Sequence, residues 1–223
     1  MTFKLYGYER NPRTKVIQIV AKAEGIELEL HRVIPRQGIG KAEYEERFSI
    51  SAGKIPGFEA IVTFLARYEH KTGLLGSGSL ASECRVLMWM SWANQELLQT
   101  LARWFLFLIP SFTDPASYSY EAVAAGRAAS LRLLDKLEDF LTGQKYLVGI
   151  EITLADIMVA IYVSRGLEWV LDAGWRSQHP AIMGHFNLVA RWDPVRAVVP
   201  QFILIDKETP NRPPRGREDF AKS

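Results

Sequence analysis

Side chains that commonly carry chemistry are few and widely spaced in this chain of 223 residues. Cys84 is the single cysteine, so the chain can form neither an internal disulfide nor a cysteine cluster for a metal. Because it lies close to Val86, Leu87 and Met88 in the sequence, we expect its side chain to pack in the core and its thiol to be unreactive. The four histidines are scattered, without the spacing of metal ligands. The sequence therefore predicts no metal site.

The sharpest local motif is the segment Thr-Leu-Ala-Asp that ends at Asp156. The Thr153 side chain can cap the backbone N–H of Asp156, and the Asp156 carboxylate can reach back to the Thr153 N–H. Ile152 and Ile157 are placed as a hydrophobic staple across the same turn. This spacing is that of a helix capping box, so we interpret Asp156 as a folding element and not as a catalytic aspartate.

Composition and charge exclude several classes of function. Hydrophobic residues make up 48% of the chain, charged residues make up 23%, and the net charge is +2. This balance is that of a globular protein, and it lacks the dense positive charge that nucleic acids require. The apolar runs are too short or too interrupted for a membrane span of about 20 residues. Residues 1–12 lack the apolar stretch of a signal peptide, so we expect a cytoplasmic protein with neither nucleic-acid nor membrane partners.

The elements that must position any site begin with alternating strand and helix patterns. Residues 3–9 alternate as a short strand, and Asn11 with Pro12 marks the start of a helix that Gly25 ends. Residues 26–34 alternate as a second strand, so the pattern predicts a βαβ unit with a parallel pair. A short polar helix over residues 41–48, a third strand over 54–58 and a helix over 60–70 complete this half.

The period becomes helical after a glycine-rich segment, residues 71–79, which we interpret as a linker. A first long helix is predicted from residue 80 to the stop at Pro110, and a third from Thr153 to residue 173, ended by Gly174. Shorter helices follow Pro180 and Pro194. A second long helix covers residues 118–141, with one apolar stripe formed by Ala124, Ala128, Leu131, Leu134, Leu137 and Leu141.

The expected fold class is therefore a small α/β domain followed by an all-α domain. The predicted division places the first domain at residues 1–72 and the helical domain at residues 80–206. Residues 207–223 are polar and proline-rich, and we expect a flexible tail there.

Three stretches together are typical of one protein family: AGKIPGFE at residues 52–59, LVGIEITLADI at 147–157 and the run from Trp175 to Val199. Through them the chain resembles the cytosolic glutathione transferase superfamily from about Phe3 to Asp206, and most narrowly the transferase-like domain of elongation factor 1 gamma. The resemblance implies a thioredoxin-like N-terminal domain that binds glutathione. It also implies an all-helical C-terminal domain that lines the pocket of the second substrate, and a homodimer.

The resemblance assigns glutathione binding to residues around the predicted third strand. Pro56 matches the family's cis-proline, and Ile55 before it would hold the cysteinyl unit through its backbone. Lys54 would lie near the glycine carboxylate, where a cation is favourable, and Lys41 could serve in the same way. The ordinary alternatives stay open: a strand-end proline at Pro56 and a solvated surface lysine at Lys41.

The chain departs from the family pattern directly after this proline. The family usually has a loop, a fourth strand and an acidic–Ser/Thr pair that binds the γ-glutamyl carboxylate at a helix start. Here Phe58 and Glu59 run straight into Ala60, and Glu59 is the candidate remnant of that pair. A true deletion, an error in the gene model and a loop omitted from the sequence all stay open. An unpaired sheet edge argues for the loop, because proteins avoid such edges.

Transferases lower the pKa of the glutathione thiol with a hydrogen-bond donor or a nearby positive charge. The family uses Tyr, Ser or Cys near the end of the first strand, and the candidates here are Tyr8, Asn11, Arg13 and Thr14. Asn11 falls nearest the Ser/Cys position, and Arg13 falls where the elongation-factor relatives also carry arginine. Two ordinary roles stay open, with Asn11 as a plain helix cap and Arg13 as a surface residue.

Aromatic side chains flank the break between the first two long helices, where the resemblance places the mouth of the glutathione site. They would line a pocket for a large apolar electrophile. Core packing of a helical bundle is the alternative for each of them. The candidates are Trp104, Phe107, Phe112 and Tyr118.

Two functions follow from the resemblance. The first is a glutathione transferase, with glutathione as co-substrate and no metal, acting on a small hydrophobic electrophile. It would catalyse conjugation, or glutathione-assisted double-bond isomerisation in a secondary-metabolite pathway, since reversible thiolate addition to an enone permits bond rotation. The second is a non-catalytic protein-interaction module like that of elongation factor 1 gamma. A gamma subunit continues into a further domain, whereas this sequence stops at Ser223, so we favour the enzyme.

Overall fold

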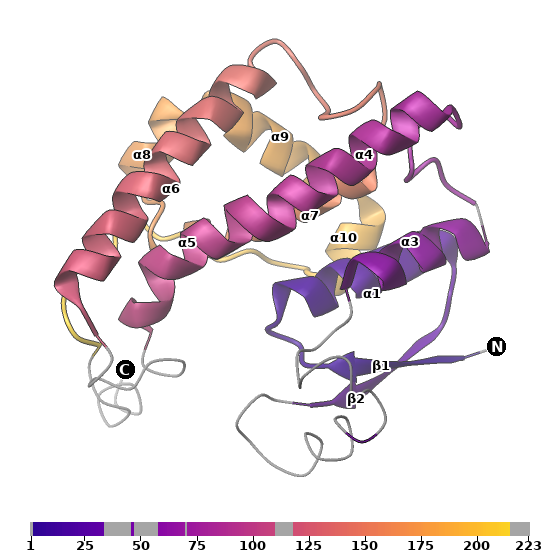
Figure 1. The fold of residues 1–223 in the computed structure, drawn as a ribbon, viewed down its shortest axis with the longest axis horizontal. Helices are drawn as coiled ribbons and strands as arrows, with labels where there is room; N and C mark the ends of the chain where they lie inside the picture. Colours follow the sequence, from indigo (N-terminus) through magenta and orange to yellow (C-terminus); the bar gives the residue numbers. More distant parts are fainter. Residues whose placement is uncertain (1, 34–45, 47–57, 70, 110–117, 215–223) are drawn as a thin grey trace.

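The chain opens with the predicted βαβ unit. The computed structural model describes residues 2–33, 46, 58–69, 71–109 and 118–214. In it β1 (Phe3–Gly7) pairs in parallel with β2 (Leu28–Arg32), with Phe3 opposite Leu28. Helices α1 (Pro12–Glu24) and α3 (Phe58–Tyr68) lie side by side over one face of these strands (Figure 1). Gly25 ends α1 with φ of 70°, in the left-handed region that favours glycine.

Most of the segment between β2 and α3 lies outside the described residues, so most of the elements predicted there are not tested. Apart from residue 46, the predicted helix over 41–48 lies outside the described residues, and so does the predicted strand up to Gly57. Phe58, predicted as the last strand residue, is instead the first residue of α3, and the centre of its buried ring lies 6.4 Å from the centre of the Tyr162 ring. The helix then runs unbroken to Tyr68, so residues 58–69 contribute no strand to the sheet.

The second half of the chain is all-helical, so the predicted α/β start with an all-α remainder is confirmed. Helix α7 (Leu154–Trp169) runs through its middle and packs against α1, α4, α5 and α9 (Figure 1). Every residue of α7 from Leu154 to Leu167 is buried. Among the described helices, none has both the length and the apolar character that crossing a membrane requires. The remaining elements are α4 (Leu80–Trp92), a π-helical turn (Ala93–Leu97), α5 (Leu98–Phe105), a 3-10 turn (Leu106–Leu108), α6 (Tyr120–Leu141), α8 (Ala173–Gln178), α9 (Pro180–Ala190) and α10 (Asp193–Val198).

The buried face of α6 differs in its first half from the predicted apolar stripe. Ala124 is only partly buried and Ala128 is exposed, whereas Val123, Gly126 and Ser130 are buried. Gly126 allows a close approach of α6 to α5, since a Cβ there would lie 2.8 Å from the α5 backbone. The Ser130 hydroxyl donates to the Gly126 carbonyl at 2.8 Å, within α6. A pattern of apolar residues misses this face because a glycine and a serine form it.

Helix α7 also ends earlier than predicted. Its last residue is Trp169, and Gly174, the predicted stop, lies inside α8. The Asp172 carboxylate accepts a hydrogen bond from the Trp175 backbone N–H at 2.9 Å, so it caps a new helix. A short acidic side chain, and not a glycine, therefore marks this boundary.

The prediction that Cys84 is packed is wrong, because its side chain is exposed on α4. The helical period turns Val86 and Met90 into the core and leaves position 84 outside.

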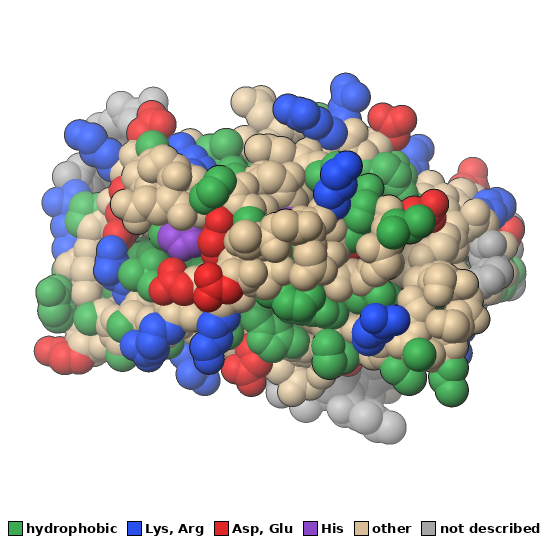
Figure 2. Space-filling model, turned by 90° about the horizontal axis from the view of Figure 1, so that it is seen from above, with side chains coloured by type: hydrophobic (Ala, Val, Ile, Leu, Met, Phe, Trp, Pro, Cys, Tyr) green, Lys and Arg blue, Asp and Glu red, His purple; other side chains and the backbone are tan. Residues whose placement is uncertain are grey.

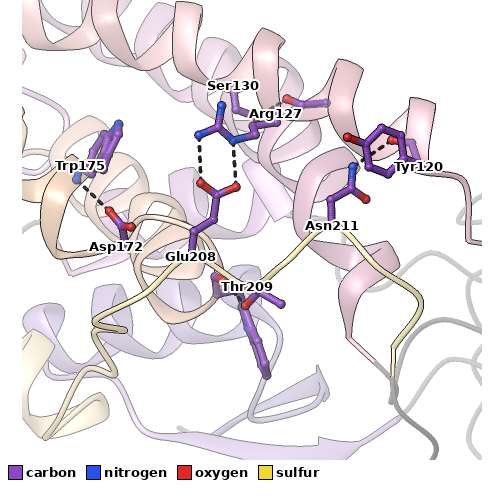
Figure 3. Close-up of polar contacts among 10 residues, drawn as sticks. Tyr120, Arg127, Ser130, Asp172, Trp175, Glu208, Thr209 and Asn211 are labelled. Carbon is purple, nitrogen blue, oxygen red and sulfur yellow. Dashed lines mark hydrogen bonds and ion pairs between the residues drawn. The ribbon is translucent and has the colours of Figure 1, made fainter.

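Part of the predicted flexible tail is held against the helices. We call residues 205–211 the C-terminal strap. Figure 3 shows Glu208 of the strap facing Arg127 of α6 and Asn211 beside Tyr120. The Glu208 carboxylate accepts two hydrogen bonds from the Arg127 guanidinium, at 2.8 and 2.9 Å. The Thr209 N–H donates to the Trp169 carbonyl at 3.3 Å, and the Asn211 amide donates to the first carbonyl of α6 at 3.1 Å. These contacts hold residues 207–211, and residues 215–223 lie outside the described part of the chain.

The predicted capping box at the start of α7 is confirmed, and it is fully buried. Asp156 has 0% of its surface exposed. Its carboxylate accepts hydrogen bonds from the Thr153 and Leu147 N–H groups, both at 2.8 Å, and from the Thr153 hydroxyl at 2.7 Å. The Nε2 atom of His185, on α9, lies 2.9 Å from the same carboxylate. One side chain thus fixes the start of α7, the loop before it and the position of α9.

Replacing Asp156 with alanine should lower the free energy of unfolding by about 3–5 kcal/mol, because several buried donors lose their acceptor. Urea unfolding followed by circular dichroism measures this change. Asp139→Ala, at an exposed position of α6, is the matched control and should change stability by less than about 0.5 kcal/mol. Similar losses in both variants would contradict the structural role given to Asp156.

Tyr162 is a buried tyrosine at the contact between the two halves of the chain. Its ring lies beside Phe58 of α3, and Arg13 of α1 lies close enough to affect its ionisation. Burial raises the pKa of Tyr162, and the positive charge of Arg13 lowers that pKa by a smaller amount. The folded protein therefore retains this phenol proton at a pH where the unfolded chain loses it.

Stability should consequently fall as the pH rises past the ordinary tyrosine pKa of about 10, at about 1.4 kcal/mol per pH unit for this residue. Below that pH the contribution of Tyr162 is fully present. Urea midpoints measured across this alkaline range should show a shallower decline for Tyr162→Phe than for the unchanged protein. Tyr120→Phe, at an exposed position, should decline like the unchanged protein. An unaltered slope in Tyr162→Phe would refute the assignment.

Candidate functional site

The turn between β1 and α1 is closed by Asn11. The Asn11 N–H donates to the Tyr8 carbonyl at 3.0 Å, and the Asn11 side-chain oxygen accepts from the Arg13 N–H at 2.9 Å. Asn11 is buried, and its side-chain oxygen serves as the helix cap, which is the ordinary role that the sequence left open. The cap places Tyr8 just before the helix and Arg13 in its first turn, where the helix dipole is positive.

A hydrogen-bonded chain joins Arg13 to Glu59, two residues that the sequence nominated separately. The Arg13 Nε donates to the Asn94 side-chain oxygen at 2.8 Å, and the Asn94 amide donates to the Glu59 carboxylate at 3.0 Å. Asn94 lies in the π-helical turn between α4 and α5. These two hydrogen bonds therefore link α1 and α3 through the helical domain. Arg13 is therefore held by its partners and is not a free surface side chain.

Tyr8 and Lys15 lie in the field of a buried arginine from α7. Burial raises the pKa of Tyr8, while Arg165 and then Arg13 lower it by less. Burial lowers the pKa of Lys15, and Arg165 lowers it further. Arg165 itself is 6% exposed and forms an ion pair with Glu168. The sequence analysis did not single out Arg165, whose signal was an arginine that follows a long apolar run in α7.

This arrangement can stabilise an anion near the start of α1. Arg165 and Arg13 lie close enough to Tyr8 to lower its pKa, and Arg13 stands in the first turn of α1, at the positive end of the helix dipole. Positive charge at a helix N-terminus lowers the pKa of a thiol and so favours the nucleophilic thiolate. Tyr8 is protonated at neutral pH, as an ordinary tyrosine is, and burial raises its pKa further, so its hydroxyl can donate a hydrogen bond.

Three of the four aromatic residues predicted to line the second-substrate pocket lie in the described part of the chain. Trp104 is 1% exposed in the core, with the Arg127 guanidinium 5.4 Å from its ring centre, which fits core packing. Phe107 is partly buried against the same core. The Tyr118 hydroxyl donates to the Asn211 side-chain oxygen at 2.6 Å, so the C-terminal strap holds it.

Five residues predicted to bind glutathione or the second substrate lie outside the described ranges: Lys41, Lys54, Ile55, Pro56 and Phe112.

Within the part of the chain that the structure describes, no group of His, Cys, Asp and Glu side chains is arranged to hold a metal ion.

Comparison with known proteins finds relatives of this chain in sequence and in structure. The glutathione S-transferase C-terminal domain matches residues 100–192. Glutathione S-transferase AN1595 of Emericella nidulans is 33% identical over 222 residues, which cover 95% of this chain and 80% of that protein. The crystal structure of the transferase-like domain of elongation factor 1-gamma from Saccharomyces cerevisiae superimposes with a TM-score of 0.74. It is 26% identical and covers 95% of this chain and 98% of that structure.

The elongation factors share only part of their length with this chain. Elongation factor 1-gamma of Artemia salina is 28% identical over 213 residues, which are 92% of this chain and 48% of that protein. The fungal transferase is matched over most of both chains. The fold is accordingly a thioredoxin-like N-terminal domain followed by a helical C-terminal domain, and the chain belongs to the glutathione S-transferase family.

Proposed function

We propose that the protein is an active glutathione transferase that directs the glutathione thiolate at a small hydrophobic electrophile. The observation that carries this proposal is the positive site around Tyr8 at the start of α1, held across the domain contact by Arg13, Asn94 and Glu59. A site of this charge lowers the cost of forming a thiolate. The similarity to a fungal transferase over nearly the whole chain supports the same function.

Each nominated residue receives a role in this proposal. Arg13 lowers the thiol pKa by its charge, Tyr8 donates a hydrogen bond in the site, and Asn11 holds the turn that carries both. Glu59 at the start of α3 fixes Asn94 and with it Arg13. Glutathione itself is held by the remaining four nominated residues, Lys41, Lys54, Ile55 and Pro56.

The second substrate enters between the N-terminal domain and the helical domain. Phe107, Phe112 and Tyr118 line its pocket in this proposal, while Trp104 supports the pocket from the core. The reaction is conjugation, or double-bond isomerisation by reversible thiolate addition as a step of secondary metabolism. The domain division at residues 1–72, 80–206 and 207–223 and a cytoplasmic location belong to the same proposal.

A second candidate function is a non-catalytic interaction module like that of elongation factor 1 gamma. The match to the yeast transferase-like domain over 95% of this chain favours it. Neither candidate calls for a nucleic-acid surface. On the face seen in Figure 2, Lys and Arg side chains are interspersed with acidic and apolar ones.

Titration calorimetry with glutathione should give one-to-one binding in the micromolar to low-millimolar range. With glutathione bound, Arg13→Met should raise the thiol pKa by about one unit, because a nearby positive charge favours the thiolate. The ultraviolet absorbance of the thiolate, followed against pH, measures this shift. Arg132→Met, at an exposed position on α6, should leave the thiol pKa unchanged.

The same glutathione titration distinguishes the two candidate functions. Absence of binding at several millimolar glutathione would overturn the transferase and leave the interaction module. Binding with an unshifted thiol pKa in Arg13→Met would keep the transferase and remove Arg13 from its proposed role.

We further propose that the protein is a homodimer through α3 and α4. Phe64 and Tyr68 on α3 and Met88 on α4 are exposed, and an ion pair between Arg67 and Glu83 joins the two helices. Met88→Glu should place a charge in this apolar surface and convert the dimer to a monomer, as measured by light scattering. Ile150→Glu, at an exposed loop position, should not change the mass. A monomeric mass for the unchanged protein would refute the proposal.

A further inference from the structure

A pocket of about 390 Å³ lies in the helical domain, between the end of α6 with the loop that follows it and one side of α9. We call it the α6–α9 pocket. Its volume is in the range of pockets that hold small organic molecules. It shares no residue with the candidate site at the start of α1. The residues that line it include Leu141, Lys145, Ala181, Gly184, His185 and Leu188.

Gly184 leaves one wall of the α6–α9 pocket without a side chain. It stands inside α9, although glycine is among the weakest helix formers. A Cβ atom at this position would meet no atom within 4 Å outside its own stretch of helix, so packing does not require a glycine there. Because Gly184 lines the pocket, any larger residue would place its side chain in the pocket space. The glycine therefore weakens α9 and keeps the pocket open.

His185 supplies a buried polar atom to the same pocket. Only 1% of its side-chain surface is exposed, and its Nε2 atom lies 2.9 Å from the Asp156 carboxylate. Its Nδ1 atom has no hydrogen-bond partner among the described residues, yet it is not one of their fully enclosed unpartnered atoms. Since His185 lines the pocket, Nδ1 is the ring atom that a ligand in the pocket would meet.

The Asp156 carboxylate determines which kind of ligand atom Nδ1 can bind. This carboxylate accepts hydrogen bonds from the backbone N–H groups of Leu147 and Thr153, so it is ionised and acts as an acceptor. The Nε2 atom of His185 must then donate to it, which leaves Nδ1 of the neutral ring as an acceptor. A carboxylate behind an imidazole also makes the free nitrogen more basic. The pocket therefore suits a ligand that carries a hydrogen-bond donor.

The remaining lining residues narrow the chemical class of this ligand. Leu141, Ala181 and Leu188 provide apolar surface, which favours a hydrocarbon ring. The exposed Lys145 is cationic, so it disfavours a ligand whose donor is an ammonium group. An ammonium group beside an aromatic ring is attracted to the face of that ring. A neutral hydroxyl group on an aromatic ring meets all of these conditions.

We propose that the α6–α9 pocket binds a phenol, whose hydroxyl group donates to Nδ1 of His185 and whose ring packs against Leu141 and Leu188. A carboxylate ligand fits less well. It has no proton to donate to Nδ1, and the ring could bind it only after taking up a proton of its own. The proposed site lies apart from the glutathione chemistry and does not depend on it.

Titration calorimetry of the full chain at neutral pH with three aromatic compounds tests the proposal. 1-Naphthol carries the hydroxyl group, 1-methoxynaphthalene has a methyl group in place of that proton, and 1-naphthoate carries a carboxylate. 1-Naphthol should bind about tenfold more tightly than either of the others, which is the effect of about one hydrogen bond. Equal binding of 1-naphthol and its methyl ether, or tighter binding of 1-naphthoate, would overturn the inference.

A variant that fills the pocket locates the binding site. Gly184→Leu should weaken the binding of 1-naphthol by at least about tenfold, because the new side chain occupies the pocket. Asn187→Leu adds the same side chain at an exposed position of α9 outside the pocket, and it should leave the affinity unchanged. Unchanged affinity in Gly184→Leu would place the bound naphthol elsewhere and would also overturn the inference.

The nuclear magnetic resonance signal of the His185 ring decides the question if Gly184→Leu does not fold. In the unchanged protein with ¹⁵N-labelled histidine, 1-naphthol should move the Nδ1 signal of His185 toward the position of a protonated nitrogen. The Nδ1 signal of His179 should not move, because that atom already lies 2.8 Å from the Trp175 carbonyl oxygen. An unmoved His185 signal at saturating 1-naphthol would refute the proposed hydrogen bond.

Discussion

The buried carboxylate of Asp156 is the constraint on which the rest of the structure depends. It accepts hydrogen bonds from two backbone amides, a hydroxyl and a histidine without any contact with water. A charge in such a place is tolerated only when its lone pairs are satisfied, so the loop, α7 and α9 must meet in one geometry. The rotation of α7 is thereby fixed at its first turn. Nine residues further on, the same helix carries Arg165, which is buried and forms an ion pair with Glu168.

Helix α7 therefore connects a folding motif at one end with a charged site at the other. Between them lies Tyr162, whose ring meets Phe58 of α3. The network from Arg13 through Asn94 to Glu59 crosses the same contact by hydrogen bonds. Packing and polar contacts thus agree on a single placement of the N-terminal domain against the helices. A site shared between two domains needs such agreement, because a shift of either domain would separate its parts.

Local motifs made the fold largely predictable from sequence. Asn11 with Pro12 and the closing Gly25 mark the two ends of α1, and the capping box marks the start of α7, since each acts within a single turn. The predictions failed where contacts between distant parts of the chain determine which residues are buried or where a helix begins. Gly126 is buried because α5 crosses there, and Asp172 starts a helix that a glycine pattern does not reveal. Tyr8 and Arg13 could be nominated by position, but Asn94 and Arg165 become visible only once the domains are packed together.

The C-terminal strap also has a consequence for the order in which parts of the chain fold. The ion pair between Arg127 and Glu208 joins positions 81 residues apart, and the strap bonds to the ends of both α6 and α7. Contacts of such long range form late, because the entropy of closing the loop must first be overcome. During synthesis residues 205–211 leave the ribosome after both helices. We therefore expect the strap to dock after α6 and α7 have formed, and Tyr118, whose hydroxyl donates to Asn211 of the strap, to become ordered in that step.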